Sequence, residues 1–165
     1  MSGDDIVIRR AERADFDTLI SLIRALADYE KLDPPDTEAQ KRLLLDGWGD
    51  SPRFEVWLAV YMGEPAGYAI VFETYSSFLA RATLYLEDIF VLPDKRNSGV
   101  GYALFRRLAG EALDRGCGRM EWACLDWNEL GLRFYDRVGA RSLDDWRYFR
   151  LVAEEMERLV GSSGK

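Results

Sequence analysis

Histidine is absent from this chain of 165 residues, and its absence excludes several kinds of chemistry at once. Without an imidazole the chain cannot form a Ser–His or Cys–His nucleophilic pair, and most zinc sites are excluded as well. A general base must therefore be a carboxylate, a tyrosine, a lysine or a cysteine. We expect no metal site.

Cysteines and long apolar runs are scarce too. Cys117 and Cys124 are too few for a disulfide framework, and we expect both to be small buried apolar groups. No apolar run approaches the ~20 residues that a membrane span needs. The polar, acidic N-terminus has no signal-peptide pattern. The sequence therefore predicts a cytoplasmic protein with no part in a membrane.

Basic residues are fewer than acidic ones. The chain has 22 Lys and Arg against 29 Asp and Glu, a net charge of −7, which disfavours nucleic acid as a partner. An acidic chain is compatible with a cationic substrate, but from net charge alone plain solubility is the better interpretation. A hydrophobic content of 48% with 31% charged residues is typical of a globular protein. We predict one domain over residues 1–160 and a disordered tail over residues 161–165.

The most informative stretch is the glycine-bearing segment RNSGVG, from Arg96 to Gly101. It follows an apolar run and opens an amphipathic one, so it is expected to join a strand to a helix. Glycines let a ligand approach the backbone closely, and the free N–H groups of a helix start attract an anion. The segment is neither a Walker loop nor a GxGxxG fingerprint. From these six residues alone, an ordinary glycine turn before a core helix is as good an interpretation.

Hydrophobic periodicity predicts a mixed α/β (α+β) chain with helices on both faces of one sheet. Asp15 is expected to cap the first helix, and Thr37 with Gln40 to form a capping box for the second. Met62 to Pro65 is expected to be a hairpin turn. Expected strands span residues 6–8, 54–61, 66–72, 83–91, 119–125 and 148–151, and expected helices residues 15–26, 37–45, 102–115, 128–138 and 152–160.

With this order in place, the glycine segment resembles the pyrophosphate-binding signature Arg/Gln-x-x-Gly-x-Gly/Ala of the GCN5-related N-acetyltransferases (GNAT). Further matches cover nearly the whole chain and are similar to the diamine acetyltransferases, the spermidine/spermine and thialysine types. This resemblance implies a mostly antiparallel twisted sheet. The matching segments are IRRA from Ile8 with Asp15, LYLEDIFV from Leu84, DWN from Asp126 and RFYDRVGA from Arg133.

The resemblance implies acetyl-CoA as the cofactor, with coenzyme A as product. Its pantetheine arm is expected to add to the strand edge at Ile89 to Val91, and its pyrophosphate to bind the amides of the glycine segment. Asn128 is expected to contact the cofactor as well, a role compatible with a plain helix N-cap. The expected cofactor-binding residues are Ile89, Phe90, Val91, Arg96, Asn97, Ser98, Gly99, Val100, Gly101, Tyr102, Asn128, Glu129 and Tyr135.

Two residues resemble the family's catalytic pair. Tyr135 is expected to protonate the departing sulfur as the general acid, although it is also compatible with a core aromatic beside Phe134. Glu87 is expected to take the proton of the substrate amine through a water, because an ammonium is not a nucleophile. The alternative for Glu87 is a half-buried strand carboxylate paired with an arginine.

The residues expected to bind the substrate are Tyr29, Glu30, Glu87 and Trp146, since carboxylates with aromatic neighbours suit an alkylammonium. The pair Asp144-Asp145 either closes the same pocket or forms a surface turn. The segments TYS from Thr74 and LDWN from Leu125 resemble the thialysine branch. The expected substrate is therefore a thialysine- or lysine-like amino acid or a short diamine, rather than a long polyamine.

We thus expect an acetyl-CoA-dependent N-acetyltransferase that works by direct attack in a ternary complex. Two alternatives stay open: a protein-lysine acetyltransferase, and a non-catalytic acyl-CoA-binding sensor on the same fold. The resemblance also implies a homodimer, because the diamine acetyltransferases pair. A dense apolar stretch from Trp146 to Val160 offers a surface for this, unless it packs in the core.

Overall fold

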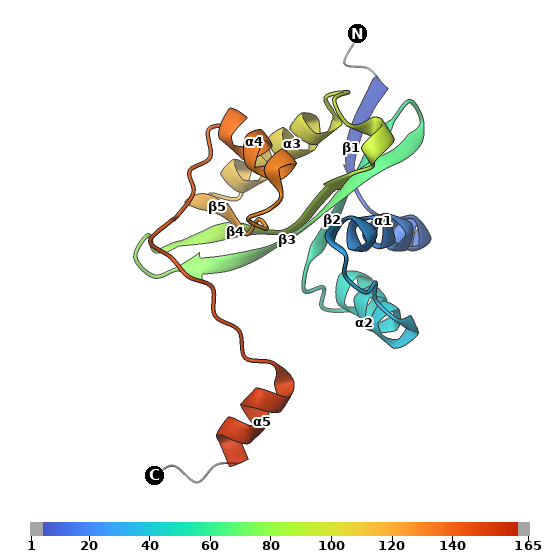
Figure 1. Cartoon of the computed structure of the whole chain (residues 1–165). Coiled ribbons are helices and arrows are strands. Elements are labelled where there is room, and N and C mark those ends of the chain that lie inside the picture. The colour runs from blue at the N-terminus through green and yellow to red at the C-terminus, as the bar shows by residue number, and fades with distance from the viewer. Residues whose placement is uncertain (1–4, 162–165) are drawn as a thin grey trace. The chain divides into compact units, whose positions relative to one another are not determined.

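The computed structural model describes residues 5–161 (Figure 1). The chain divides after Ala123 into two compact units, which we describe in turn. The single domain over residues 1–160 stays a prediction. In the expected disordered tail, Gly161 instead ends a helix, and residues 162–165 lie outside the described part of the chain.

The first unit is built on a five-stranded sheet in the order β1-β2-β3-β4-β5. Neighbouring strands pair antiparallel, except that β4 and β5 run parallel. This confirms the prediction of a mixed, mostly antiparallel sheet. The strands are β1 Ile6–Arg10, β2 Glu55–Tyr61, β3 Glu64–Ser76, β4 Arg81–Val91 and β5 Arg119–Trp122.

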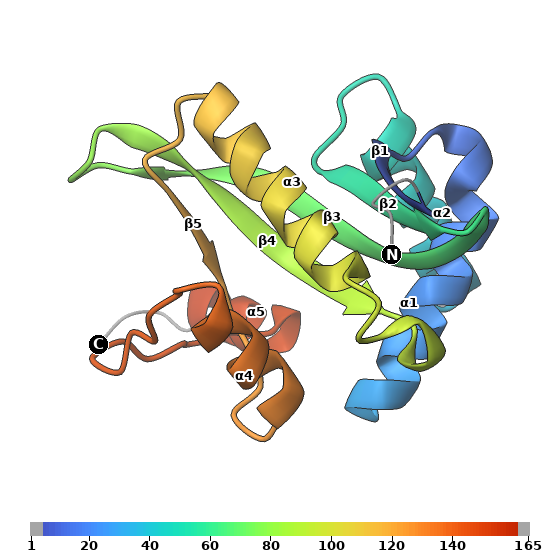
Figure 2. The same cartoon turned by 90° about the horizontal axis from the view of Figure 1, so that it is seen from above.

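Helices cover both faces of this sheet, as expected (Figures 1 and 2). α1 and α2 pack on one face and α3 packs on the other. The second unit, described by itself, contains two further helices. The helices are α1 Phe16–Glu30, α2 Thr37–Trp48, α3 Val100–Asp114, α4 Glu129–Arg137 and α5 Ala153–Gly161, with short 3-10 turns at Arg13–Asp15 and Pro93–Lys95.

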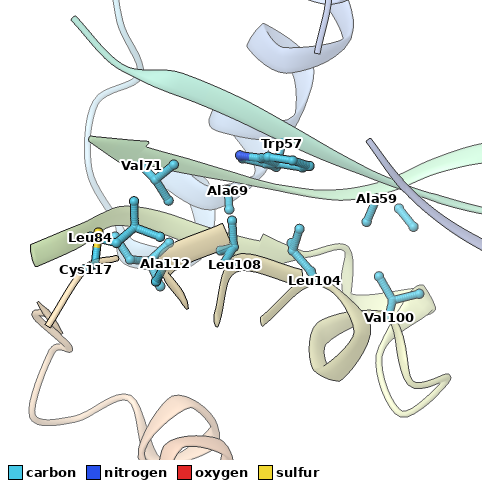
Figure 3. Close-up of a cluster of buried hydrophobic side chains, with 12 residues drawn as sticks. Trp57, Ala59, Ala69, Val71, Leu84, Val100, Leu104, Leu108, Ala112 and Cys117 are labelled. Carbon is cyan, nitrogen blue, oxygen red and sulfur yellow. The ribbon is translucent and has the colours of Figure 1, made fainter. Parts of the chain in front are cut away.

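The core of the first unit has two layers, because alternate strand residues point to opposite faces of the sheet. On β2, Trp57 and Ala59 face α3, whereas Val56 and Leu58 face α1 and α2. Figure 3 shows the α3 layer, in which side chains of one helix face meet the sheet. The buried residues of this layer include Trp57, Ala69, Val71, Leu84, Leu86, Val100, Leu104, Leu108 and Cys117.

One helix cap lies at the predicted residue and the other does not. Asp15 stands at the N-cap of α1 as predicted, but its carboxylate does not bond the helix: it accepts from the Glu12 amide at 2.7 Å and pairs with Arg9. It therefore fixes the turn before the helix. The cap of α2 is Asp36, one residue before Thr37, and its side chain accepts from the Ala39 amide at 2.8 Å. A carboxylate in extended backbone satisfies that amide directly, so no Thr37–Gln40 box is needed.

The hairpin turn is tighter than predicted. Met62 and Gly63 both have positive φ, 52° and 82°, so only two residues make the turn and β3 begins at Glu64. β3 also continues to Ser76, because its ladder with β4 extends to Arg81. β5 ends at Trp122 rather than at Leu125, because Trp122 and Leu86 are the last pair in the ladder between β5 and β4.

One predicted strand is wrong. Residues 148–151 are irregular in the structure, with Tyr148 76% and Phe149 91% exposed. A strand needs a neighbour to complete its ladder of hydrogen bonds, and the described part of the second unit has no strand to provide one. The cysteine prediction is half right, since Cys117 is buried and Cys124 is only partly so.

Candidate functional site

The segment between β4 and α3 has the geometry of an anion-binding helix start. Asn97 and Gly99 both adopt positive φ, 63° and 91°, which turns the chain sharply into α3. Gly99 is the N-cap of α3 and has no side chain to accept from the first-turn amides. Those amides have no partner within the helix and point along its positive dipole end. The segment can therefore receive a phosphate group, which fits the cofactor that the sequence implies.

Arg96 links this segment to the first helix. Its Nε donates to the Val91 carbonyl at 3.0 Å. Its guanidinium carbon lies 4.9 Å from the Tyr29 ring centroid and 5.6 Å from that of Phe90. An expected cofactor residue and an expected substrate residue are thus in direct contact. These cation–π contacts hold the arginine against α1.

A β-bulge in β4 controls where the key carboxylates point. Asp88 pairs with Ile70 and Leu86 pairs with Val71, so Glu87 is the extra residue of the ladder. Leu86, directly before the bulged residue, and Ile89, two residues after it, both pack in the α3 layer. Glu87 and Asp88 therefore share the opposite face, where simple alternation would separate them.

That face forms one wall of a cavity of about 590 Å³, of the size of a small-molecule site. The strands supply Glu87, Asp88 and apolar side chains, while α1, α2 and the segment before β2 supply the other wall. The lining residues are Ile23, Pro35, Ala39, Arg42, Leu43, Asp46, Arg53, Phe54, Ile70, Phe72, Glu87 and Asp88.

The electrostatics of the carboxylates favour a cation. The pKa of Asp88 is raised to about 6, chiefly by burial and to a smaller extent by the negative charges of Glu87 and Glu30. The Tyr68 hydroxyl opposes this shift by donating to Asp88 Oδ2 at 3.1 Å. Burial also raises the pKa of Glu30. Three neighbouring carboxylates in a partly desolvated place attract a positively charged group.

The edge of β4 beyond the bulge fits the predicted docking of an extended chain. β5 pairs with β4 only from Thr83 to Leu86. Ile89 to Val91 extend past that ladder, so β5 does not use their outward backbone groups. An extended amide-bearing ligand can pair with such an edge.

The other expected residues lie in the second unit. Asn128 is the N-cap of α4 and its side chain accepts from the Gly131 amide at 3.1 Å. Glu129 pairs with Arg133 in the same helix at 3.3 Å. Tyr135 is half-buried on α4, with its ring against the edge of Phe134 at 5.6 Å. It is thus not a fully buried core aromatic.

Trp146 and the acidic pair Asp144-Asp145 belong to an irregular segment of the second unit. Trp146 is 76% exposed, and its amide donates to the Leu143 carbonyl at 3.1 Å, as in a surface turn. Asp144 accepts from the Ser142 hydroxyl.

Of the twelve residues that line the cavity, only Glu87 is a predicted site residue, and the missing ones include four with charged side chains: Asp88, Arg42, Asp46 and Arg53. Its position next to Glu87 could have indicated Asp88 as a cavity residue, but strand alternation argues against two consecutive residues in one pocket. Arg42 and Asp46 had the weaker signal of four-residue spacing on a helix. In residues 5–161, Glu87 forms no salt bridge with an arginine, contrary to the alternative considered for it.

Residues 5–161 contain no group of three or more Cys, Asp or Glu arranged to hold a metal ion. Among the helices of this part of the chain, none has the length and apolar character needed to cross a membrane.

Comparison with known proteins agrees with this geometry. Residues 18–140 match the acetyltransferase (GNAT) family. A thialysine N-epsilon-acetyltransferase from Sus scrofa is 36% identical, over 94% of this chain and 98% of that protein. An L-ornithine N5-acetyltransferase from Arabidopsis thaliana is 37% identical, over 57% of this chain and 41% of its own length.

A solved structure has the same fold. An integron cassette protein from the mobile metagenome of V. cholerae superposes with a TM-score of 0.79 at 21% identity, over 96% of this chain and 99% of that one. The family match spans most of the chain, and the first relative aligns along nearly its whole length. The chain therefore belongs to the acetyltransferase (GNAT) family, and it is an N-acetyltransferase that uses acetyl-CoA as acyl donor and releases coenzyme A.

Proposed function

We propose that this enzyme acetylates a primary amine of a small cationic substrate, a thialysine- or lysine-like amino acid or a short diamine. The observation that carries the proposal is the bulge in β4, which turns Glu87 and Asp88 into one cavity. Two neighbouring carboxylates, of which Asp88 is partly buried, suit an ammonium that must approach an extended thioester beside a strand edge. The thialysine- and ornithine-acetylating relatives act on amines of this kind.

The cofactor site has four parts in this proposal. The α3 start at Gly99 to Tyr102 holds the pyrophosphate, and the β4 edge at Ile89 to Val91 holds the pantetheine amides. Arg96 keeps its cation–π contact with Tyr29 and adds positive charge near the phosphates. Asn128 and Glu129 at the start of α4 complete the binding residues.

The chemistry requires two proton transfers, and we assign one residue to each. Bound acetyl-CoA supplies an activated acetyl group as a thioester. Glu87, through a water, accepts the proton that the substrate ammonium must lose before its nitrogen forms the new C–N bond. As the C–S bond breaks, the Tyr135 hydroxyl donates a proton to the sulfur. Transfer is direct, with no acyl-enzyme.

Among other acetyltransferase substrates, a protein lysine requires a groove that admits a peptide backbone. The cavity beside Glu87 is pocket-sized, and its long apolar side chains suit a short alkyl chain better. The small-amine relatives also favour this class of substrate.

We also propose a cytoplasmic homodimer. The irregular segment and α5 expose a row of large apolar side chains, more than a solvated surface usually presents. Residues 148–151 have strand-forming side chains, and a second copy could provide the neighbour that a strand needs. The exposed residues are Trp146, Tyr148, Phe149, Leu151, Val152, Met156, Leu159 and Val160.

A substrate panel tests the proposal. Purified enzyme is incubated with acetyl-CoA and, separately, with thialysine, lysine, ornithine, a short diamine, spermidine and a lysine peptide. Thiol release and the mass of each amine are followed together. We expect efficient acetylation of the small amino acids or the diamine. Acetylation of the peptide alone, or of no amine, would contradict the proposal.

A further inference from the structure

The cavity beside Glu87 has charged residues on both walls, although an amine alone needs only negative charge. The strand wall carries two carboxylates, Glu87 and Asp88. The opposite wall carries Arg42 and Asp46 from α2 and Arg53 from the segment before β2. Positive and negative groups thus occupy the wall that faces the carboxylates.

The three charges of the second wall are held close together. Arg42 and Asp46 are four residues apart on α2, so they share one face of the helix. The Arg53 amide donates to the Asp46 carbonyl at 2.7 Å, which fixes Arg53 beside the end of the same helix. Two arginines and one aspartate from neighbouring positions of the backbone therefore line the same cavity.

The two arginines are available to a ligand. In residues 5–161, neither Arg42 nor Arg53 forms a salt bridge with a carboxylate, whereas Arg9 and Arg115 each pair at 2.7 Å. Both side chains are exposed at the cavity, and Asp88 across from them is partly buried. An anionic group that enters the cavity therefore meets donors with no competing partner of their own.

This charge distribution separates two classes of amine. A diamine carries ammonium groups at both ends, so one end would lie against the guanidinium groups of Arg42 and Arg53 and be repelled. An α-amino acid with a terminal amine carries a carboxylate and an ammonium at one end and an ammonium at the other. The charges at each end of the amino acid are therefore opposite in sign to those of the wall that the end would face.

We infer that the cavity recognises the head group of an α-amino acid. Arg42 and Arg53 bind the α-carboxylate, Asp46 binds the α-ammonium, and the side-chain ammonium lies at Glu87 and Asp88 for acetylation. Between the charged ends, the methylene chain packs on the apolar lining, which includes Ile23, Leu43, Ile70 and Phe72. This inference rests on the proposed function and narrows its substrate from a small cationic amine to an amino acid.

The test compares substrates that differ only in the carboxylate. Lysine and thialysine are compared with their decarboxylated counterparts, cadaverine and bis(2-aminoethyl) sulfide, by kcat/KM with acetyl-CoA. The enzyme is used as wild type and as Arg42→Gln, Arg53→Gln and the double variant. Lys41→Gln is the matched control, because it also removes one positive charge from α2. Lys41 pairs with Glu38 and is not among the residues that line the cavity.

The wild type should prefer the amino acids. The double variant should lose roughly 10- to 100-fold in kcat/KM for them, mainly through KM, as expected for lost charge-assisted hydrogen bonds. Its kcat/KM for the diamines should rise, because the repelling charges are gone. Arg→Lys at both positions should restore part of the preference, and Lys41→Gln should keep the wild-type ratio.

Binding of lysine and cadaverine without acetyl-CoA, measured by calorimetry, separates this inference from the proposed function. Selective lysine binding that depends on the two arginines supports the inference even if no amine is acetylated, a result that would overturn the function alone. Equal use or binding of lysine and cadaverine by the wild type would overturn the inference. So would a preference unchanged in the double variant.

Discussion

Replacing Asp88 with Asn should stabilise the protein at neutral pH and do little at acidic pH. Burial raises the pKa of this carboxyl from 3.8 to about 6 in the folded protein. Its folded pKa therefore exceeds its unfolded pKa, and its contribution to stability is fully present below the unfolded pKa. That contribution is lost as the pH rises through the folded pKa. Above pH 6 Asp88 is ionised in the native state, and this ionised carboxylate is less stable in the folded protein than in the unfolded chain.

The magnitude follows from the shift. A pKa change of about two units corresponds to about 3 kcal/mol at full ionisation, and partial solvent access reduces this to roughly 1–2 kcal/mol between about pH 4.5 and about pH 8. Asn keeps the shape and can still accept from the Tyr68 hydroxyl, so the difference reports the charge. Tyr68→Phe removes the hydrogen bond that opposes the pKa shift of Asp88. In a chain that keeps Asp88, it should therefore increase the loss of stability between the lower and the higher pH.

Urea denaturation at about pH 4.5 and about pH 8 measures this effect as a difference between Asp88→Asn and wild type. Asp114→Asn removes a carboxylate from the exposed end of α3 and serves as the control, with changes expected within about 0.5 kcal/mol. If Asp88→Asn alters stability equally at both pH values, the burial argument is wrong. If it destabilises more at the higher pH, a cation of the protein itself must neutralise Asp88.

Three further predictions concern the cofactor, the proton transfers and the assembly. Gly99→Asp or Gly101→Asp places a side chain and a negative charge at the α3 start, so acetyl-CoA affinity in a titration should fall greatly; unchanged affinity would rule out this phosphate site. Tyr135→Phe should lower kcat by roughly 10²–10⁴-fold with cofactor binding nearly intact. Glu87→Gln should lower the rate most at acidic pH, where more of the amine is protonated; near-wild-type turnover by both variants would mean another proton route. Light scattering at micromolar concentration should give twice the chain mass of 18.9 kDa, and a monomer mass would refute the dimer.

The elements that sequence predicts well are those in which local chemistry and tertiary packing agree. The helix after Gly99 has an apolar face that meets the sheet through Leu104 and Leu108, and its start needs the positive φ that glycine provides. The antiparallel strands follow from hydrophobic runs and the Met62-Gly63 turn. For these elements, the fold could be derived from the residues alone.

The remaining features depend on partners that the local sequence does not specify. Nothing in the run LYLEDIFV marks Glu87 as the bulged residue, because the bulge is set by the register between β3 and β4. Residues 148–151 have the composition of a strand but no neighbouring strand in their own unit. The two arginines of the cavity belong to segments with no motif. The packing of α2 on the sheet places Arg42 in the cavity, and the backbone bond from Arg53 to Asp46 holds Arg53 beside the end of that helix.

The most direct test of the central claim measures two products in one reaction. Wild-type enzyme is mixed with acetyl-CoA and thialysine, and free thiol and N-acetylated amine are measured over the same interval. The account predicts that the two appear in equal amounts and that both fall together in Glu87→Gln. Thiol release without acetylated amine would show hydrolysis of the thioester instead of transfer, and would contradict the role assigned to the cavity beside Glu87.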